Sequence, residues 1–383
     1  GGFRIGVSAR LAKVALARFG GVPADAVEEC WHALEPPYAP LFAWLEGRAP
    51  QPDAAGAPVF RPVMLAHPLE DEDLESFEPA AYAAEWKWDG VRVQAVGAPD
   101  GRRRLYTRTG DDIGAAFPDV VDAIDFIGVV DGELLIADGA DFDAAGPFEP
   151  ADFAALQKRL NRKSVAKATL NRSPAFVRLY DLLFDGADDL RAQPFRTRRA
   201  RLEAWFAERP RPRFDLSAQV AFDDLAQLRA IRESARADGV EGLMLKRWDS
   251  PYLPGRPKGR WWKWKRAPLT IDAVLMYAQR GHGGRSSFYS DFTFGCWTDG
   301  AEAALAPVGK AYSGFTNEEM KALDKWVRAH TVARYGPVRE VTPGLVFEVA
   351  FDGVQRSTRH RSGVALRFPR IARIRWDKPI AEA

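Results

Sequence analysis

The stretch Glu85-Trp86-Lys87-Trp88-Asp89-Gly90-Val91-Arg92 anchors the interpretation of the whole chain. Residues 84–96 alternate with β-branched and aromatic side chains and contain an Asp-Gly pair, which predicts two strands joined by a tight turn. A lysine between two strand-forming aromatic residues presents its ammonium group at the wall of a pocket. Taken alone, this short pattern is weak, and it favours a solvated lysine in a β-hairpin.

Five further motifs follow in order and change that interpretation. They are Thr107-Arg108-Thr109-Gly110, Asp131-Gly132-Glu133-Leu134, residues 176–183, residues 240–246 and Trp262-Lys263-Trp264-Lys265. Strand alternation places Lys263 and Lys265 on one face and the two tryptophans on the other. Chance occurrence of the whole series in this order is negligible.

The segments around these motifs predict a mixed α/β domain followed by a small β-barrel. In the first domain, strands are expected at 104–108, 129–136, 175–184, 242–246 and 261–265, and helices at 117–126, 152–160, 196–208 and 225–236. After Pro268, strands are expected at 271–279, 288–297, 345–351 and 364–368, with one helix at 317–330. A barrel with one inserted helix suggests the OB-fold.

The chain therefore divides into a helical segment (1–50), a Pro/Ala/Gly-rich linker (51–61), a mixed α/β domain (62–268) and an OB-fold domain (269–383). The predicted fold class is α+β with several domains. Because a helical pattern is already under way where the chain begins, we expect residues 1–50 to be the C-terminal remnant of a longer helical domain.

Composition excludes several classes of protein. The 383 residues have a net charge of +2, are 46% hydrophobic and include 23 Phe and 12 Trp, which argues against disorder. No apolar run approaches the length of a membrane span. Two cysteines, Cys30 and Cys296, cannot form a four-thiolate zinc site, and so few favour a reducing compartment. Residues 246–266 and 356–378 are strongly basic, which favours a polyanionic partner.

The ordered motifs resemble those of the covalent nucleotidyltransferases, which include DNA ligases, RNA ligases and mRNA capping enzymes. They are most similar to ATP-dependent DNA ligases of the bacterial type. The resemblance continues through 277–283, Phe347-Glu348-Val349, 366–371 and 375–378, and it covers the chain from about Pro62 to its end. It implies that 62–268 is the adenylation (nucleotidyltransferase) domain and that 1–50 is the end of a helical DNA-binding domain.

The resemblance also implies a role for each motif residue. Lys87 is the nucleophile that attacks the α-phosphate of ATP and holds AMP, and we expect cationic, partly dry surroundings to lower its pKa. Tyr180 stacks on the base. The other implied contacts are Glu85 (adenine edge), Arg92 and Arg108 (ribose and phosphate), Glu133 (ribose or metal), Glu241 (metal), Arg256 (triphosphate), Lys263 and Lys265 (α-phosphate), and Arg370, Arg375, Asp377 and Lys378 (departing pyrophosphate).

ATP and Mg²⁺ (or Mn²⁺) are the cofactors that the resemblance implies, and nicked duplex DNA is the implied partner. AMP passes from the lysine to a 5′-phosphate at the nick, which the 3′-hydroxyl then attacks. ATP is favoured over NAD because the chain has neither a recognisable nicotinamide-binding segment nor enough cysteines for the zinc finger of NAD-dependent ligases. A cytoplasmic, nucleoid-associated monomer without membrane contact is expected.

Two alternatives remain at this point. The chain could be an RNA-directed relative, either an RNA ligase or a capping-type nucleotidyltransferase. Incubation with labelled ATP and with labelled GTP would distinguish a capping enzyme from a ligase. It could also be a non-catalytic nucleic-acid-binding protein that uses the barrel and the basic strands. The presence of Lys87, Glu133, Glu241, Lys263 and Lys265 argues against the second alternative.

Overall fold

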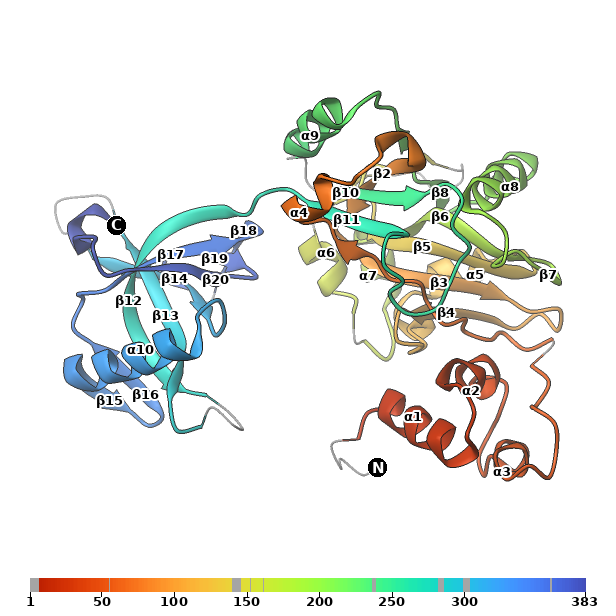
Figure 1. Ribbon diagram of the computed structural model, residues 1–383, viewed down its shortest axis with the longest axis horizontal. Helices are drawn as coiled ribbons and strands as arrows, with labels where there is room; N and C mark the ends of the chain where they lie inside the picture. Colours follow the sequence, from red (N-terminus) through yellow and green to blue (C-terminus); the bar gives the residue numbers. More distant parts are fainter. Residues whose placement is uncertain are drawn as a thin grey trace. The chain divides into compact units, whose positions relative to one another are not determined.

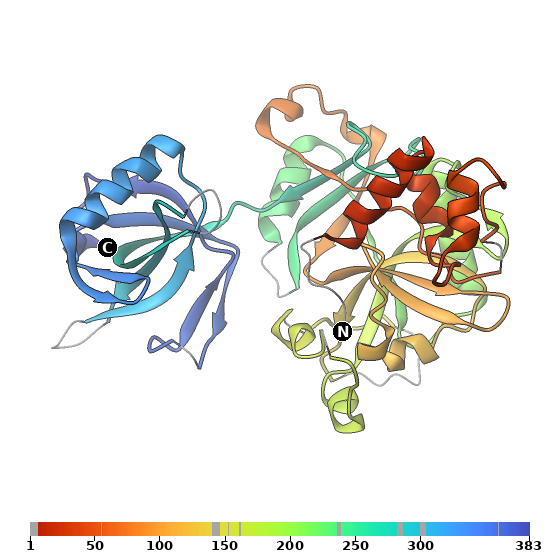
Figure 2. The ribbon, with the colours of Figure 1, turned by 90° about the horizontal axis from the view of Figure 1, so that it is seen from below.

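The computed structural model divides into two compact units, Gly1–Arg266 and Ala267–Ala383 (Figures 1 and 2). The described residues are 7–54, 56–139, 146–151, 153–160, 162–235, 239–281, 286–298, 304–358 and 360–383. His282 and Gly283, the end of one motif, lie outside them. Among the described residues, none of the helices combines the length and the apolar character needed to cross a bilayer.

The first unit begins with three short helices: α1 (Ala9–Gly20), α2 (Ala24–Trp31) and α3 (Ala39–Leu45). Ser8 caps α1 by accepting a hydrogen bond from the Leu11 amide at 3.2 Å, and the left-handed Gly21 ends the helix. Val27, Leu41 and other apolar side chains are buried between the helices. The helices therefore share a small core of their own.

One sheet of the first unit carries the lysine motifs. It contains β1 (His67–Pro68), β2 (Tyr82–Trp88), β9 (Gln219–Val220), β10 (Val240–Arg247) and β11 (Trp261–Lys265), in the order β1-β11-β10-β2-β9. In the antiparallel register, Gly242 lies opposite Lys87 on one side and Lys265 on the other. The two motif lysines thus lie on the strands that flank the central strand, at the same level of the sheet.

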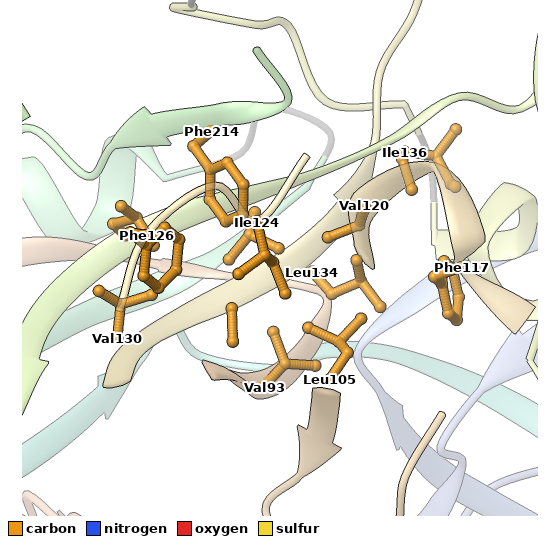
Figure 3. Packing of buried hydrophobic residues seen from close by; sticks show 14 of the residues in the cluster. Val93, Leu105, Phe117, Val120, Ile124, Phe126, Val130, Leu134, Ile136 and Phe214 are labelled. Carbon is orange, nitrogen blue, oxygen red and sulfur yellow. The ribbon is translucent and has the colours of Figure 1, made fainter. Parts of the chain in front are cut away.

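The second sheet of this unit is built around the expected long strands. It contains β3 (Val91–Gly97), β4 (Arg103–Thr107), β5 (Gly128–Ile136), β6 (Ala175–Asp185), β7 (Asp188–Asp189) and β8 (Phe214–Leu216). The order is β4-β3-β5-β6-β7, and β8 pairs with β6 in parallel. Val93, Leu105, Phe117, Leu134 and Phe214 are among the buried residues that form the main core here (Figure 3).

Six further α-helices lie in the described part of this unit. They are α4 (Asp71–Leu74), α5 (Pro118–Asp122), α6 (Phe153–Gln157), α7 (Lys167–Arg172), α8 (Phe195–Glu208) and α9 (Leu225–Ser234). The helices expected at 117–126 and 152–160 are shorter than predicted. After α5 the chain must turn into β5, and Ile124 and Phe126 enter the core without further helical turns. Of the helices expected at 152–160 and 225–236, residues 152 and 236 lie outside the described residues.

The second unit is the predicted OB-fold domain. Its sheet contains β12 (Leu269–Arg280), β13 (Tyr289–Trp297), β14 (Leu305–Ala311), β15 (Thr331–Tyr335), β16 (Val338–Val341), β17 (Val346–Phe351) and β20 (Arg370–Arg375). Strand β12 pairs along its length with β13, β16 and β17. β18 (Gly353–Arg356) and β19 (Val364–Arg367) form a separate two-stranded sheet, and Leu366 of β19 packs into the core of this unit.

Helix α10 (Asn317–His330) is the one long helix described in this unit, as predicted. Thr316 and Glu319 form a capping box that satisfies the first amides of the helix. Met320, Leu323 and Val327 are buried, and the last two join Phe292, Phe347 and other residues in the unit's core.

Candidate active site

Lys87 lies on β2 with its side chain 22% exposed and forms an ion pair with Glu241 of β10. Lys265 also reaches this carboxylate, with Nζ 3.3 Å from Oε2. Burial raises the pKa of Glu241, but the two lysines outweigh burial and hold it below its usual range. β10 therefore places Glu241 directly beside Lys87, and the surroundings of this lysine contain a carboxylate as well as the expected cations.

Other cations lie near this ion pair. The pKa of Lys263 is lowered by burial and by the charges of Arg256, Lys87, Lys265 and Arg108. The exposed turn after β4 supplies Arg108, and the exposed loop between β10 and β11 supplies Arg256. Trp262 and Trp264 are buried, as the alternation predicted, so Lys263 and Lys265 face the opposite side. The structure thus brings five of the predicted cations together.

Glu133 of β5 approaches the same group of charges from the second sheet. Burial raises its pKa to about 7, the cations Lys87 and Arg92 act in the opposite direction, and Glu241 and Asp89 raise the pKa further. A Cβ on Gly90 would come within 2.8 Å of the Glu133 Cγ atom, so the Asp-Gly turn leaves room for this side chain. Glu133 and Glu241 are therefore two carboxylates of one site.

Arg92 is held by a buried network. Its guanidinium donates to Asp131 Oδ2 at 2.5 Å and to the Tyr252 hydroxyl at 2.9 Å, and that hydroxyl donates to Asp131 Oδ2 at 2.6 Å. The Arg92 guanidinium carbon lies 5.9 Å from the ring centroid of Tyr180. Burial raises the pKa of Tyr180 well above its usual value. The network fixes Arg92 beside the ring that is predicted to stack on the base.

Glu85 is fixed by two cations, Lys246 and Arg199, to which the sequence motifs assigned no role. Lys246 of β10 donates to Glu85 Oε2 at 2.9 Å, and the Arg199 Nη1 atom of α8 lies 3.6 Å from Oε1. The Lys246 ammonium is 4.4 Å from the Tyr180 ring centroid and 4.9 Å from those of Phe195 and Trp261. Lys246 is the last residue of the 240–246 motif, and this membership is the signal that the sequence offered. Arg199 has no such signal.

The four predicted C-terminal residues all lie in the second unit, where each of them forms an ion pair within that unit. The Arg370 Nη1 atom lies 3.3 Å from Asp352 Oδ1, and the Lys378 Nζ atom lies 2.6 Å from Asp272 Oδ2. Arg375 forms two ion pairs: its Nη2 atom lies 3.0 Å from Asp377 Oδ2, and its Nη1 atom lies 3.7 Å from Asp272 Oδ2. Three of the four predicted residues therefore share one small group of charges around Asp272 and Asp377.

The charges around Lys87 are suited to Mg²⁺ bound together with phosphates. Within the described residues, no group of three or more His, Cys, Asp or Glu side chains could hold a metal by itself. Glu133 and Glu241 nevertheless interact electrostatically with each other and with Lys87. Mg²⁺ is usually held by one or two carboxylates plus waters and substrate phosphates, so this pair fits it.

Comparisons with known proteins identify the family. The family signature described as "ATP dependent DNA ligase domain" matches residues 63–265, and "ATP dependent DNA ligase C terminal region" matches residues 285–378. The chain belongs to the ATP-dependent DNA ligases. The fold expected for this family, a nucleotidyltransferase domain followed by an OB-fold, is the fold described above.

Individual relatives of this ligase chain are similar over most of it. A "Probable DNA ligase" of Koribacter versatilis is 37% identical over 84% of this chain and 58% of that protein. A "DNA ligase" of Thermococcus onnurineus is 31% identical over 100% of this chain and 68% of that protein. A solved structure titled as an analysis of Lig E DNA ligases shares the fold, with a TM-score of 0.56, 19% identity, and coverage of 83% of this chain and 100% of that one. The chain spans between 31% and 58% of the length of the first three curated relatives it matches.

Proposed function

We propose that this chain is the catalytic part of an ATP-dependent DNA ligase that seals nicks in duplex DNA and works as a monomer. The observation that carries the proposal is the position of Lys87, a partly exposed amine beside Glu241 with Lys263, Lys265, Arg108 and Arg256 gathered near it. A triphosphate is the ligand that such a group of cations suits, because phosphoryl transfer depends mainly on positioning and charge neutralisation.

In the first step, Lys87 Nζ attacks the α-phosphorus of ATP. A phosphorus–nitrogen bond forms, the bond to the β-phosphate oxygen breaks, pyrophosphate leaves, and Nζ gives up a proton. Lys263 and Lys265 neutralise the α-phosphate, Arg108 and Arg256 contact the nucleotide, and Tyr180 stacks on its base. A bound Mg²⁺, held by Glu133 and Glu241, would supply further neutralisation of the triphosphate.

The remaining steps act on DNA. AMP passes from Lys87 to the 5′-phosphate of a nick, and attack by the 3′-hydroxyl then forms the phosphodiester and releases AMP. The basic stretches 246–266 and 356–378 would contact the phosphate backbone. We therefore expect sequence-independent binding that weakens steeply as the salt concentration rises.

Intact-mass measurement after incubation with ATP and Mg²⁺ tests the proposal. We expect one adenylyl group per wild-type chain, and none on Lys87→Ala. Lys167→Ala, at an exposed lysine of α7, is the matched control and should be adenylated like the wild type. Equal adenylation of Lys87→Ala would contradict the proposal, and labelling by GTP in place of ATP would favour a capping-type enzyme.

A further inference from the structure

His32, at the end of α2, contacts the turn that carries Arg108. Its Nε2 atom lies 2.9 Å from the carbonyl oxygen of Gly110. The ring also packs against Tyr106, with centroids 4.7 Å apart, and against Phe60, at 5.8 Å. A helix in the N-terminal segment is thus joined by a hydrogen bond and by ring packing to the end of β4.

The protonation of His32 follows from these contacts. A carbonyl oxygen only accepts hydrogen bonds, so Nε2 carries the proton and donates. Burial lowers the pKa of His32 to about 4, Lys13 lowers it further, and the Gly110 carbonyl, Asp112 and Asp111 act in the opposite direction. Nδ1 is then unprotonated and could only accept a hydrogen bond, and within the described residues this buried atom has no hydrogen-bond partner.

The turn is closed by a backbone hydrogen bond and packs closely against α2. Gly110 has a φ of +80°, and its amide donates to the Thr107 carbonyl at 2.9 Å. A Cβ at Gly110 would lie 3.2 Å from atoms of Glu28, His32 and Phe60, so the turn packs closely against the helix. A displacement of α2 would therefore displace the whole turn, including Arg108.

A second set of contacts anchors the same helix at another place. Glu29 forms ion pairs with both Arg61 and Arg191. The two guanidinium carbons lie 4.4 and 5.0 Å from the ring centroid of Phe184. None of these groups belongs to the 107–110 turn. Docking of α2 and positioning of the turn can therefore be separated by mutation.

We propose that His32 is a positioning residue for the adenylation reaction: its hydrogen bond to Gly110 holds the 107–110 turn so that Arg108 stays beside Lys263 and the nucleotide. This inference rests on the proposed function, because it assigns Arg108 to ATP. It gives the N-terminal helical segment a role in the first step, the formation of lysyl-AMP.

Two substitutions at His32 separate its hydrogen bond from its packing. His32→Phe keeps an aromatic ring but removes the donor, and His32→Gln keeps an N–H donor. Loss of one such hydrogen bond corresponds to about a tenfold change in an equilibrium constant. We expect His32→Phe to raise the KM for ATP in lysyl-AMP formation about tenfold with kcat changed less than twofold, and His32→Gln to recover most of that loss.

Glu29→Gln is the matched control, because it weakens the other anchor without touching the turn. It should lower the melting temperature and leave the KM for ATP unchanged. If Glu29→Gln raises the KM as much as His32→Phe does, His32 only docks the helix and the inference is wrong. A wild-type chain that forms no lysyl-AMP at all would instead contradict the proposed function.

A double-mutant cycle tests the route through Arg108. Arg108→Ala should raise the KM for ATP, and adding His32→Phe to it should raise the KM no further. Fully multiplicative effects of the two substitutions would overturn the inference. Circular dichroism of each variant shows whether it is folded, and His32→Gln keeps the test decisive if His32→Phe does not fold.

Discussion

Glu133 and Glu241 are two carboxylates of the same site with opposite electrostatic behaviour. Glu241 makes direct ion pairs with Lys87 and Lys265, and these hold its pKa below the usual range. Glu133 interacts with Lys87 and Arg92 but, within the described residues, forms no comparable direct ion pair, so burial dominates and raises its pKa to about 7. Near neutral pH, Glu241 is therefore ionised, and Glu133 can still take up or release a proton.

The raised pKa of Glu133 predicts how stability depends on pH. The folded-state pKa of about 7 lies above the ordinary value of 4.5, so the folded state retains a proton that the unfolded state has lost. In metal-free buffer, the free energy of unfolding should fall as pH rises from 4.5 to 7, by up to about 3 kcal/mol from this residue. Urea unfolding at several pH values measures this, and Glu133→Gln should flatten the dependence. An unchanged slope in that variant would contradict the assignment.

Residues that belong to a motif could be identified from the sequence, but residues that hold them in place mostly could not. Arg92 and Glu85 stand at fixed spacings from Lys87, so the pattern itself singles them out. Tyr252 and Arg199, which contact them, are 160 and 114 positions away in the chain. Only the fold brings such pairs together, and no local periodicity indicates them.

At the scale of elements, the β2-β10-β11 ladder creates the site. Gly242, in the centre, has a φ of +143°, and an added Cβ would lie 2.3 Å from the Trp264 carbonyl oxygen. A glycine there lets β11 approach β10 closely. Since Lys87 and Lys265 lie opposite Gly242, this close approach also sets the distance between the strands that carry them.

Gly242→Ala should therefore disrupt both stability and the site. The left-handed backbone and the overlap with β11 should together cost about 3 kcal/mol or more. Gly47→Ala is a matched control, because Gly47 also has a positive φ (+71°) but a Cβ there would meet no atom of the described residues within 4 Å; it should cost about 1 kcal/mol. Denaturant unfolding and the yield of lysyl-AMP measure the two effects. Equal losses in both variants would show that backbone strain alone is responsible.

Long alternating strands were predictable, whereas short strands and exact helix lengths were not. The strand expected at 175–184 is β6 (Ala175–Asp185), and the helix expected at 317–330 is α10 (Asn317–His330). Strands β7 and β9 contain two residues each, too few for a period to be recognised. They exist because neighbouring strands offer unpaired backbone groups, which is a tertiary effect.

At the scale of the whole molecule, the predicted nucleotide contacts are divided between two units with separate cores. Lys87 and the cations around it belong to Gly1–Arg266, and Arg370, Arg375 and Lys378 belong to Ala267–Ala383. If residues of both units contact the triphosphate, Arg375 and Lys378 take part in that contact only while pyrophosphate is present. This restricts the predicted chemical role of these two cations to the first step of the proposed reaction and leaves the DNA contacts to the other cations of 356–378.

Arg375→Ala combined with Lys378→Ala tests that restriction. We expect lysyl-AMP formation to slow at least tenfold, because two cations that would neutralise the departing pyrophosphate are lost. Transfer of AMP from previously adenylated protein to nicked DNA should change less than twofold, since no pyrophosphate takes part. Rapid-quench assays of the two steps, begun from ATP and from the isolated adenylate, measure these rates separately.

Two controls distinguish this chemical role from a structural one. Asp272→Asn breaks the contacts of Asp272 with Lys378, at 2.6 Å, and with Arg375, at 3.7 Å, but keeps both cations. Arg334→Ala removes an exposed cation of β15 elsewhere in the same unit. Both controls should form lysyl-AMP within about twofold of the wild-type rate. An equal slowing in Asp272→Asn would mean that the ion pairs only stabilise the second unit, and an equal slowing of both reaction steps in the double variant would mean that the two cations act on DNA.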